Sequence, residues 1–161
     1  MNEWKLPPKE KIYEAFCVLA DKRYTIESAG KAYITSSGRN KQYTLEWTEE
    51  HTPSAIVIKI SSNDNASYWQ GYTGYPIIAV LMIIDKLHFD KNILKYLKNI
   101  PWKVLNKTYN NNYTRAAEKI LTDIDNEAVA VKIRSEVDNV FSQLSGLCLV
   151  KPDKFIKPPK D

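Results

Sequence analysis

Two observations predict an α+β fold: the hydrophobic period changes twice along the chain, and one central segment is apolar on every side. Apolar residues recur at helical spacing near the N-terminus, alternate over residues 24–60, and return to helical spacing after residue 76. We therefore expect an N-terminal helix, then a three- or four-stranded antiparallel meander, then a helical C-terminal half packed on one face of the sheet.

The N-terminal helix is predicted over residues 9–22, directly after a pair of prolines that suit a helix start. Ile12, Phe16 and Leu19 recur at the spacing of one buried helix face. Lys11 lies among the polar residues of this segment and is expected to stay in water. The pattern is that of an amphipathic surface helix.

The meander is predicted from segments whose residues alternate between apolar and polar. Tyr43, Leu45 and Trp47 alternate with polar residues, as in a sheet with one face in water. Glycine-containing turns at residues 28–30 and 37–40 separate the segments and favour antiparallel pairing of neighbours. The predicted strands are residues 24–26, 31–36, 41–48 and 55–60.

The C-terminal half is predicted to be helical, with one helix at the centre of the core. Residues 77–84 are apolar without interruption, so this helix has no face that can remain in water. Four further helices are expected at residues 90–99, 101–105, 113–124 and 126–144. Residues 147–150 are expected to be a short extended segment that still packs on the domain.

Length and composition predict one domain followed by a tail. A chain of 161 residues can bury a substantial core without a metal or a disulfide. We place the domain at residues 1–150. Residues 151–161 contain three prolines and four lysines and are predicted to be disordered and basic, although Phe155 and Ile156 can dock weakly.

The cellular location is predicted to be cytoplasmic. The longest apolar run, residues 77–84, is far shorter than the roughly 20 residues of a membrane span, so no membrane contact is expected. Cys17 and Cys148 lack C-x-x-C spacing and indicate free thiols of a reduced compartment. No secretory signal is recognised at the N-terminus.

The sequence gives little support for catalysis, and we expect no metal and no cofactor. His51 and His88 lie in predicted connections and are not near a nucleophile motif. The cysteines and histidines are too scattered for a zinc site, and no glycine-rich nucleotide fingerprint is present. Whether the protein is an enzyme is left open, leaning against; the one acid–base candidate is Asp64, flanked by Asn63 and Asn65.

The candidate site is the stretch of residues 61–76, between the last predicted strand and the central helix. It contains three tyrosines, a tryptophan and two glycines but only one charged residue, an unusual composition for a solvated connector. A structural loop whose rings close the end of the core is the alternative interpretation. The predicted binding residues in this stretch are Asn63, Asp64, Asn65, Tyr68, Trp69, Gln70, Tyr72, Thr73 and Tyr75.

The net charge of +4 is mild, but the lysines are concentrated in residues 86–120, directly after this stretch. Lys95 and Lys98 are therefore added to the predicted site, because rings that stack on bases beside lysines that contact phosphates bind single-stranded nucleic acid. The leading hypothesis is a non-catalytic binding module for nucleic acid, a nucleotide or a peptide. An assembly protein that uses the same stretch and the C-terminal helix to contact another protein is the alternative, and an enzyme using Asp64 is the third.

Overall fold

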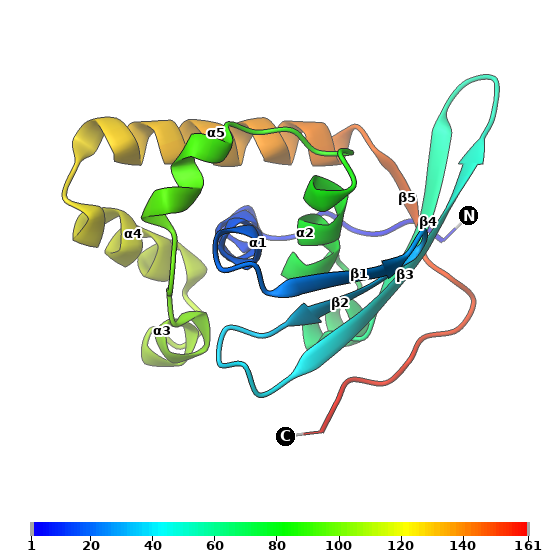
Figure 1. Cartoon of the computed structure of the whole chain (residues 1–161), viewed down its shortest axis with the longest axis horizontal. Helices are drawn as coiled ribbons and strands as arrows, with labels where there is room; N and C mark the ends of the chain where they lie inside the picture. Colours follow the sequence, from blue (N-terminus) through cyan, green and yellow to red (C-terminus); the bar gives the residue numbers. More distant parts are fainter. Residues whose placement is uncertain (1, 161) are drawn as a thin grey trace.

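The structure, a computed structural model, describes residues 2–160 and contains one five-stranded sheet in the order β1-β2-β3-β4-β5 (Figure 1). The first four strands pair antiparallel with their neighbours in sequence, whereas β5 pairs parallel with β4. The strands are β1 (Tyr24–Ser28), β2 (Lys31–Thr35), β3 (Gln42–His51), β4 (Ile56–Ser62) and β5 (Cys148–Val150). The α+β class, with an antiparallel meander after an N-terminal helix, is confirmed.

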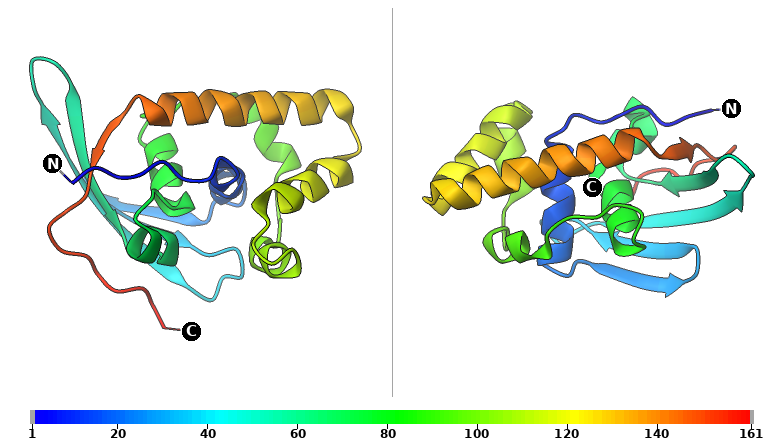
Figure 2. Two further views of the ribbon diagram at one scale, coloured as in Figure 1. Left: turned by 180° about the vertical axis from the view of Figure 1, so that it is seen from behind. Right: turned by 90° about the horizontal axis from the view of Figure 1, so that it is seen from above.

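The helices lie on one side of this sheet, and Figures 1 and 2 show the C-terminal segment running along the other side. They are α1 (Lys11–Ala20), the π-helical turn η1 (Ala66–Gln70), α2 (Tyr75–Ile83), the 3-10 helix η2 (Lys91–Tyr96), α3 (Trp102–Thr108), α4 (Tyr113–Ile124) and α5 (Glu127–Ser145). No helix within residues 2–160 is long and apolar enough to cross a membrane.

Helix α2 lies at the centre of the core, as its composition predicts. Residues 77–81 are fully buried, and they lie between the sheet and α1 in a core that continues to α5. Burial ends sooner than the apolar run does, because the helix ends at Ile83 and Ile84 is its C-cap. Both of these last residues are only partly buried.

The N-terminal segment and the strand β5 extend the fold beyond the predicted meander. Residues 148–150 form a true strand, because a parallel partner, β4, is available to them after the α5 crossover. The backbone nitrogen of Trp4 donates to the carbonyl of Leu149 at 3.1 Å, and its indole Nε1 donates to the carbonyl of Ile60 at 2.9 Å. The N-terminal segment and β5 are thereby fixed beside β4.

Several element boundaries differ from the sequence prediction, and β3 and the segment of η2 show why. Strand β3 continues to His51 and pairs with Ile56, because hydrogen bonds between backbones hold the hairpin even where side chains are polar. The helix expected over residues 90–99 is only the 3-10 helix η2, which ends at Tyr96. The backbone of Asn99 is left-handed at φ +58°, and Pro101 follows, so the chain cannot continue as a helix.

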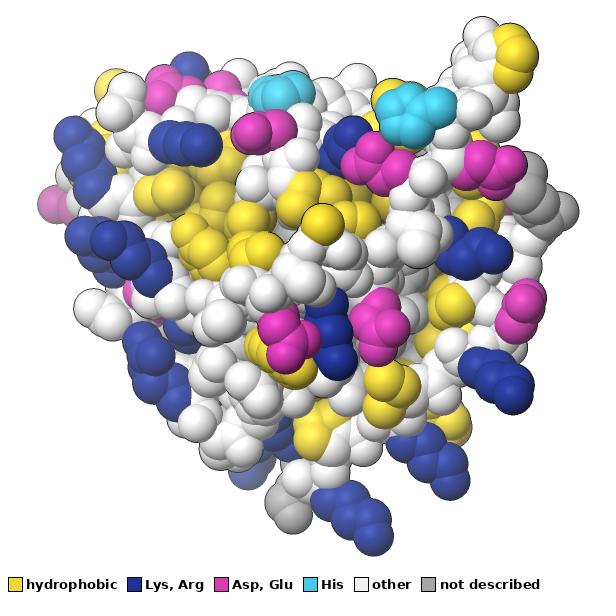
Figure 3. All heavy atoms as spheres, turned by 45° about the vertical axis from the view of Figure 1, so that its right-hand side comes forward, with side chains coloured by type: hydrophobic (Ala, Val, Ile, Leu, Met, Phe, Trp, Pro, Cys, Tyr) yellow, Lys and Arg dark blue, Asp and Glu magenta, His cyan; other side chains and the backbone are white. Residues whose placement is uncertain are grey.

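The outer edge of β1 is open, since among residues 2–160 no strand pairs with it. Tyr24 and Ile26 lie opposite Ile34 and Ala32 and so point to the helical side, yet they are 37% and 43% exposed. Figure 3 shows apolar side chains gathered on this side of the molecule. The helix layer therefore stops short of β1.

Candidate functional site

The inner side of the predicted site, residues 61–76, is held by the carboxylate of Asp64. Its Oδ1 accepts hydrogen bonds from the hydroxyls of Ser62 at 2.5 Å and Ser67 at 2.7 Å. Its Oδ2 accepts from the backbone nitrogen of Ser67 at 3.1 Å, and the Ser67 hydroxyl in turn accepts from the backbone nitrogen of Gly74 at 3.0 Å. Asp64 is buried, so these bonds offset the desolvation of its charge and tie the two ends of the stretch together.

Close packing and two further polar side chains complete this inner side. A Cβ at Gly74 would lie 2.2 Å from Oδ2 of Asp64, so no larger residue fits there. The side-chain Oδ1 of Asn63 accepts from the backbone nitrogen of Thr44 at 2.8 Å, which continues the sheet into the loop. Thr73 is buried, and its hydroxyl has no hydrogen-bond partner among the described residues.

The outer side of the same stretch carries the rings. Trp69 is 69% exposed on η1 and meets Tyr68 edge-on, with ring centroids 4.6 Å apart. Tyr68 and Tyr72 are half-buried, and Asn65 and Gln70 are exposed. Trp69 therefore does not close the end of the core, whereas Tyr75 of the same stretch packs against it, so the alternative interpretation describes one ring and not the other.

A series of ring contacts connects Trp69 to both ends of the chain. Tyr68 meets Phe155 of the C-terminal segment at a perpendicular angle, with centroids 6.3 Å apart. Phe155 meets Trp4 of the N-terminal segment in the same way at 5.8 Å. The division of the chain at residue 150 stays a prediction, but within the described residues Phe155 packs against the domain.

Lysines of both chain ends contact this group of residues, one of them through its side chain. The Nζ of Lys151 lies 5.1 Å from the centroid of the Trp4 ring, and a Cβ at Gly71 would come within 3.1 Å of it. The backbone of Gly71 is left-handed, at φ +74°, so glycine is favoured there on both grounds. Lys5 forms a backbone bridge with Tyr72, and the carbonyl of Lys157 accepts a 3.4 Å hydrogen bond from Asn63.

Lys95 and Lys98 are not part of this group. They are exposed on and after η2, which lies beside α5, whereas η1 lies on the far side of α1 and α2 (Figures 1 and 2). Sequence adjacency to the aromatic stretch does not become adjacency in space, because α2 carries the chain across the core between the two.

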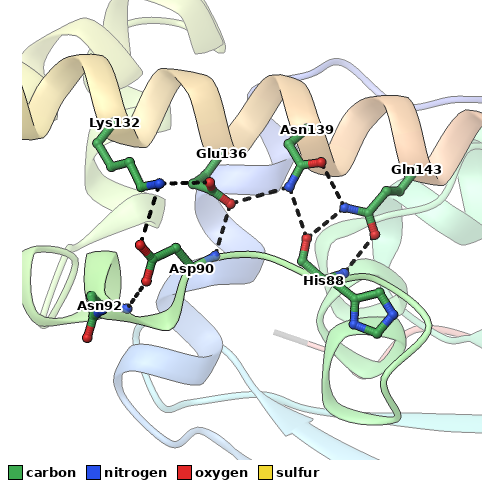
Figure 4. Close-up of polar contacts among 7 residues, drawn as sticks. All are labelled: His88, Asp90, Asn92, Lys132, Glu136, Asn139 and Gln143. Atoms are coloured by element: carbon green, nitrogen blue, oxygen red, sulfur yellow. Dashed lines mark hydrogen bonds and ion pairs between the residues drawn. The ribbon is translucent and has the colours of Figure 1, made fainter.

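Polar contacts with α5 fix the segment that leads into η2 (Figure 4). Gln143 accepts from the backbone nitrogen of His88 at 2.8 Å and donates to its carbonyl at 2.6 Å. Glu136 accepts from the backbone nitrogen of Asp90 at 3.0 Å, and Asp90 caps η2 by accepting from Asn92. The position of Lys95 away from the rings is thus a property of the packed fold.

A pocket of about 250 Å³ lies next to the inner side of the stretch. It is enclosed by α1, the turn between β2 and β3, the start of the stretch, and α3. Asp64, Asn65 and Tyr75 of the predicted site line it, together with Lys11, Glu14, Ser36, Ser37, Gly38, Asn40, Lys41, Tyr43, Ala66, Lys103 and Asn106.

A buried ion pair forms one wall of this pocket. The Nζ of Lys11 lies 3.0 Å from Oε2 of Glu14 and 4.1 Å from the centroid of the Tyr113 ring. The expectation that Lys11 stays in water is wrong, because Glu14, one helical turn along, supplies the opposite charge that makes burial tolerable. Burial, the largest single influence, lowers the pKa of Lys11, but the charge and hydrogen bond of Glu14, together with Tyr113 and Tyr72, raise it above its usual value.

Two tyrosines near the pocket have raised pKa values. Burial is the main cause for Tyr75, whose pKa is well above its usual value, and the neighbouring Tyr43 adds to the effect. Burial also raises the pKa of Tyr72, against the opposing charge of Lys11. Both hydroxyls therefore remain protonated, and able to donate, at neutral pH.

The pocket residues outside residues 61–76 were not predicted as site residues. The i,i+3 spacing of Lys11 and Glu14 was the available signal, since it places opposite charges on neighbouring positions of one helix face. That signal is weak, because most such pairs lie in solvent. Asn106 and Lys103 carry no sequence signal that distinguishes them from other polar helix residues.

Comparison with known proteins yields a family. Residues 4–150 match the family described as uncharacterised conserved protein UCP014422, and the chain belongs to that family. The match covers the stretch 61–76 and the pocket, and it ends before Lys151 and Phe155. No curated protein and no solved structure matches the chain.

Proposed function

We propose that this protein binds single-stranded nucleic acid through the terminal aromatic surface, defined as Trp69, Tyr68, Phe155, Lys151 and Lys157. The exposure of the Trp69 ring, at 69%, is the observation that carries the proposal. Large apolar rings are normally withdrawn from water, and an exposed ring supported by a rigid scaffold is a common feature of binding surfaces.

The geometry of η1 suits stacking. The edge-to-face contact with Tyr68 occupies at most one face of the indole ring of Trp69. The Asp64 hydrogen bonds beneath the turn hold the backbone that carries both rings. A base can therefore stack on Trp69 at a low cost in conformational entropy, since the platform is already in place.

The charges beside the rings suit a phosphate backbone. Residues 151–160 contain four lysines and one aspartate, and they pass the rings without forming a helix or strand. Lysines on such a segment can follow a flexible single strand, which presents a phosphate with every base. The nucleic-acid hypothesis is thus kept, with the terminal lysines in place of Lys95 and Lys98.

The test is a titration of labelled single-stranded RNA and DNA at two salt concentrations. Wild-type protein should bind at micromolar concentration and more weakly at the higher salt, because phosphate contacts release counterions. Lys151→Gln should flatten the plot of log affinity against log salt by about 0.7 for each phosphate that the variant no longer neutralises. Lys95→Gln removes the charge of an exposed lysine that lies away from the rings, and it should leave the slope unchanged.

Two results would overturn this proposal. Wild-type protein that shows no salt-dependent binding at micromolar concentration has no nucleic-acid surface of this kind. Contact with another protein would then be the better account of the exposed rings, since aromatic residues are equally enriched at protein interfaces. Equal flattening by Lys95→Gln and Lys151→Gln would instead mean that the lysines act through overall charge rather than through this surface.

A further inference from the structure

The two edges of the sheet differ in how they are covered. At the β5 edge, the backbone nitrogen of Trp4 donates to the carbonyl of Leu149, and Glu3 forms a bridge with Val150, so the N-terminal segment lies against the strand. At the β1 edge, no segment within residues 2–160 pairs with the strand. Figure 2 shows β1, in blue, at the border of the molecule in its right-hand view. An unpaired edge strand can accept a strand of another chain.

The backbone of β1 directs hydrogen-bonding groups outward at two positions. The nitrogen of Thr35 in β2 donates to the carbonyl of Arg23 at 2.9 Å, so position 23 is bonded to β2. Bonded positions alternate along an antiparallel pair, and Thr25, opposite Tyr33, is therefore the next one. The N–H and C=O groups of residues 24 and 26 point the other way, to the open edge.

The features that usually discourage pairing at a sheet edge are mostly missing from β1. Lysine, proline and bulges protect such edges, and residues 24–28 contain neither lysine nor proline. The register shifts between Ile26 and Ser28, so the one bulge lies at the C-terminal end of the strand. Residues 24–26 are left as a regular segment whose side chains are all exposed.

We propose that β1 pairs with β1 of a second copy of this chain, antiparallel and centred on Thr25, so that one sheet continues through a symmetric dimer. In this register Tyr24 lies opposite Ile26 of the partner subunit, and the reverse pair repeats the contact. Both residues direct their backbone groups outward, so each pair can exchange two hydrogen bonds. An aromatic ring opposite a β-branched side chain is a favourable cross-strand pair.

Charge complementarity favours a second copy over another extended chain. Lys22 precedes β1 and Glu27 lies near its end, and both side chains are exposed. Antiparallel self-pairing brings the basic end of each strand beside the acidic end of the other, twice in one dimer. The contact of Glu27 with Lys31 of its own chain, at 3.6 Å, leaves half of the Glu27 side chain in water and available to Lys22 of the partner subunit.

The first test measures the mass of the full chain by sedimentation between about 1 and 200 µM, the range in which a small interface associates. The mass should rise from 18.6 kDa toward twice that value. Ile26→Lys should weaken the dimer Kd by about 10-fold or more, because it places a charge at the pairing edge. Ile56→Lys is the matched control: Ile56 is 42% exposed, against 43% for Ile26, but lies on β4, and its substitution should leave the Kd unchanged.

A cross-linking test does not depend on how well Ile26→Lys folds. In a chain that carries Cys148→Ser, with Cys17 buried, Thr25→Cys should form a disulfide between two copies under mild oxidation. The two Cα atoms at the symmetry axis are expected about 4.5 Å apart, which suits a disulfide. Ser28→Cys, an exposed position of the same strand, would be about 20 Å from its counterpart and should remain reduced.

Charge reversal tests the choice of occupant. Glu27→Lys should weaken the dimer by about 2- to 5-fold, and adding Lys22→Glu should restore it, because the two ends then carry opposite charges again.

A chain that stays monomeric at 200 µM would overturn the proposal and leave β1 to a strand of another protein. Equal weakening by Ile26→Lys and Ile56→Lys, equal cross-linking at residues 25 and 28, or a reversed pair no better than Glu27→Lys alone would overturn it as well. A dimer that cross-links at residue 25 and is weakened only by the substitution in β1 supports it.

Discussion

Helix α2 and the turn η1 are separated by only four residues and have opposite relations to solvent. Seven of the nine residues of α2 are buried, whereas Ser67 is the one buried residue of η1. Both segments are rich in large apolar groups, yet one forms the centre of the core and the other presents Trp69 to water. Proximity in the chain and apolar content together do not determine burial.

The difference lies in how each segment is anchored. Helix α2 has only apolar side chains after its first two residues, so burial on all sides is its single favourable arrangement. The stretch that contains η1 is anchored instead by buried hydrogen bonds around Asp64, which leave its rings free to face outward. Substitutions in the two segments should therefore differ in their effect on stability and on binding.

The largest loss of stability should come from α2. Leu81→Ala removes a fully buried side chain and leaves a cavity, so it should lower the free energy of unfolding by about 2–5 kcal/mol. Leu81→Met keeps the volume and should cost less than about 1.5 kcal/mol. Urea unfolding of both variants is the measurement, and a free energy equal to wild type for Leu81→Ala would show that α2 is not the centre of the core.

A smaller loss should come from the inner side of the stretch. Gly74→Ala forces a methyl group against the Asp64 carboxylate and should cost about 1–3 kcal/mol through overpacking. Gly146→Ala is the matched control, since its nearest neighbour would be 3.5 Å away and its backbone is already helical. Similar unfolding free energies for the two variants would contradict the anchoring role of the Asp64 contacts.

A still smaller effect is expected where the C-terminal segment meets the rings. Phe155→Ala removes two edge-to-face contacts, with Trp4 and Tyr68, and should lower the free energy of unfolding by about 0.5–1.5 kcal/mol. Ile156→Ala, at a neighbouring exposed residue of the same segment, is the control. If Phe155→Ala leaves the melting curve unchanged, the segment is held to the domain too weakly to place its lysines.

Patterns that repeat along the chain predicted most of the fold. The alternation at Tyr43, Leu45 and Trp47 predicts a strand with one face in water. The apolar run of α2 predicts a buried helix. Both patterns can be recognised within a single segment of the sequence. Strand β5 is different, because its extended conformation was predicted but three residues do not indicate which strand they pair with. Its pairing depends on the crossover through α5 and could not be read from residues 148–150.

The candidate site was predictable in part for the same reason. Composition identified the stretch 61–76, but the partners of that stretch are brought together by topology. Lys151 and Phe155 reach it from the far end of the chain, while the nearer Lys95 is carried away by α2. Burial of Lys11 likewise depends on α3 and α4, which lie about a hundred residues further along the chain.

The most direct test of this account is a paired measurement on Trp69→Ala, in which the free energy of unfolding and the affinity for a labelled single strand are determined on the same sample. Because Trp69 is exposed, stability should change by less than about 0.5 kcal/mol. Binding should weaken by about 1–3 kcal/mol through loss of a stacking platform, with the salt slope unchanged. A large loss of stability, or binding equal to that of the wild type, would contradict the assignment of the exposed ring to nucleic-acid binding.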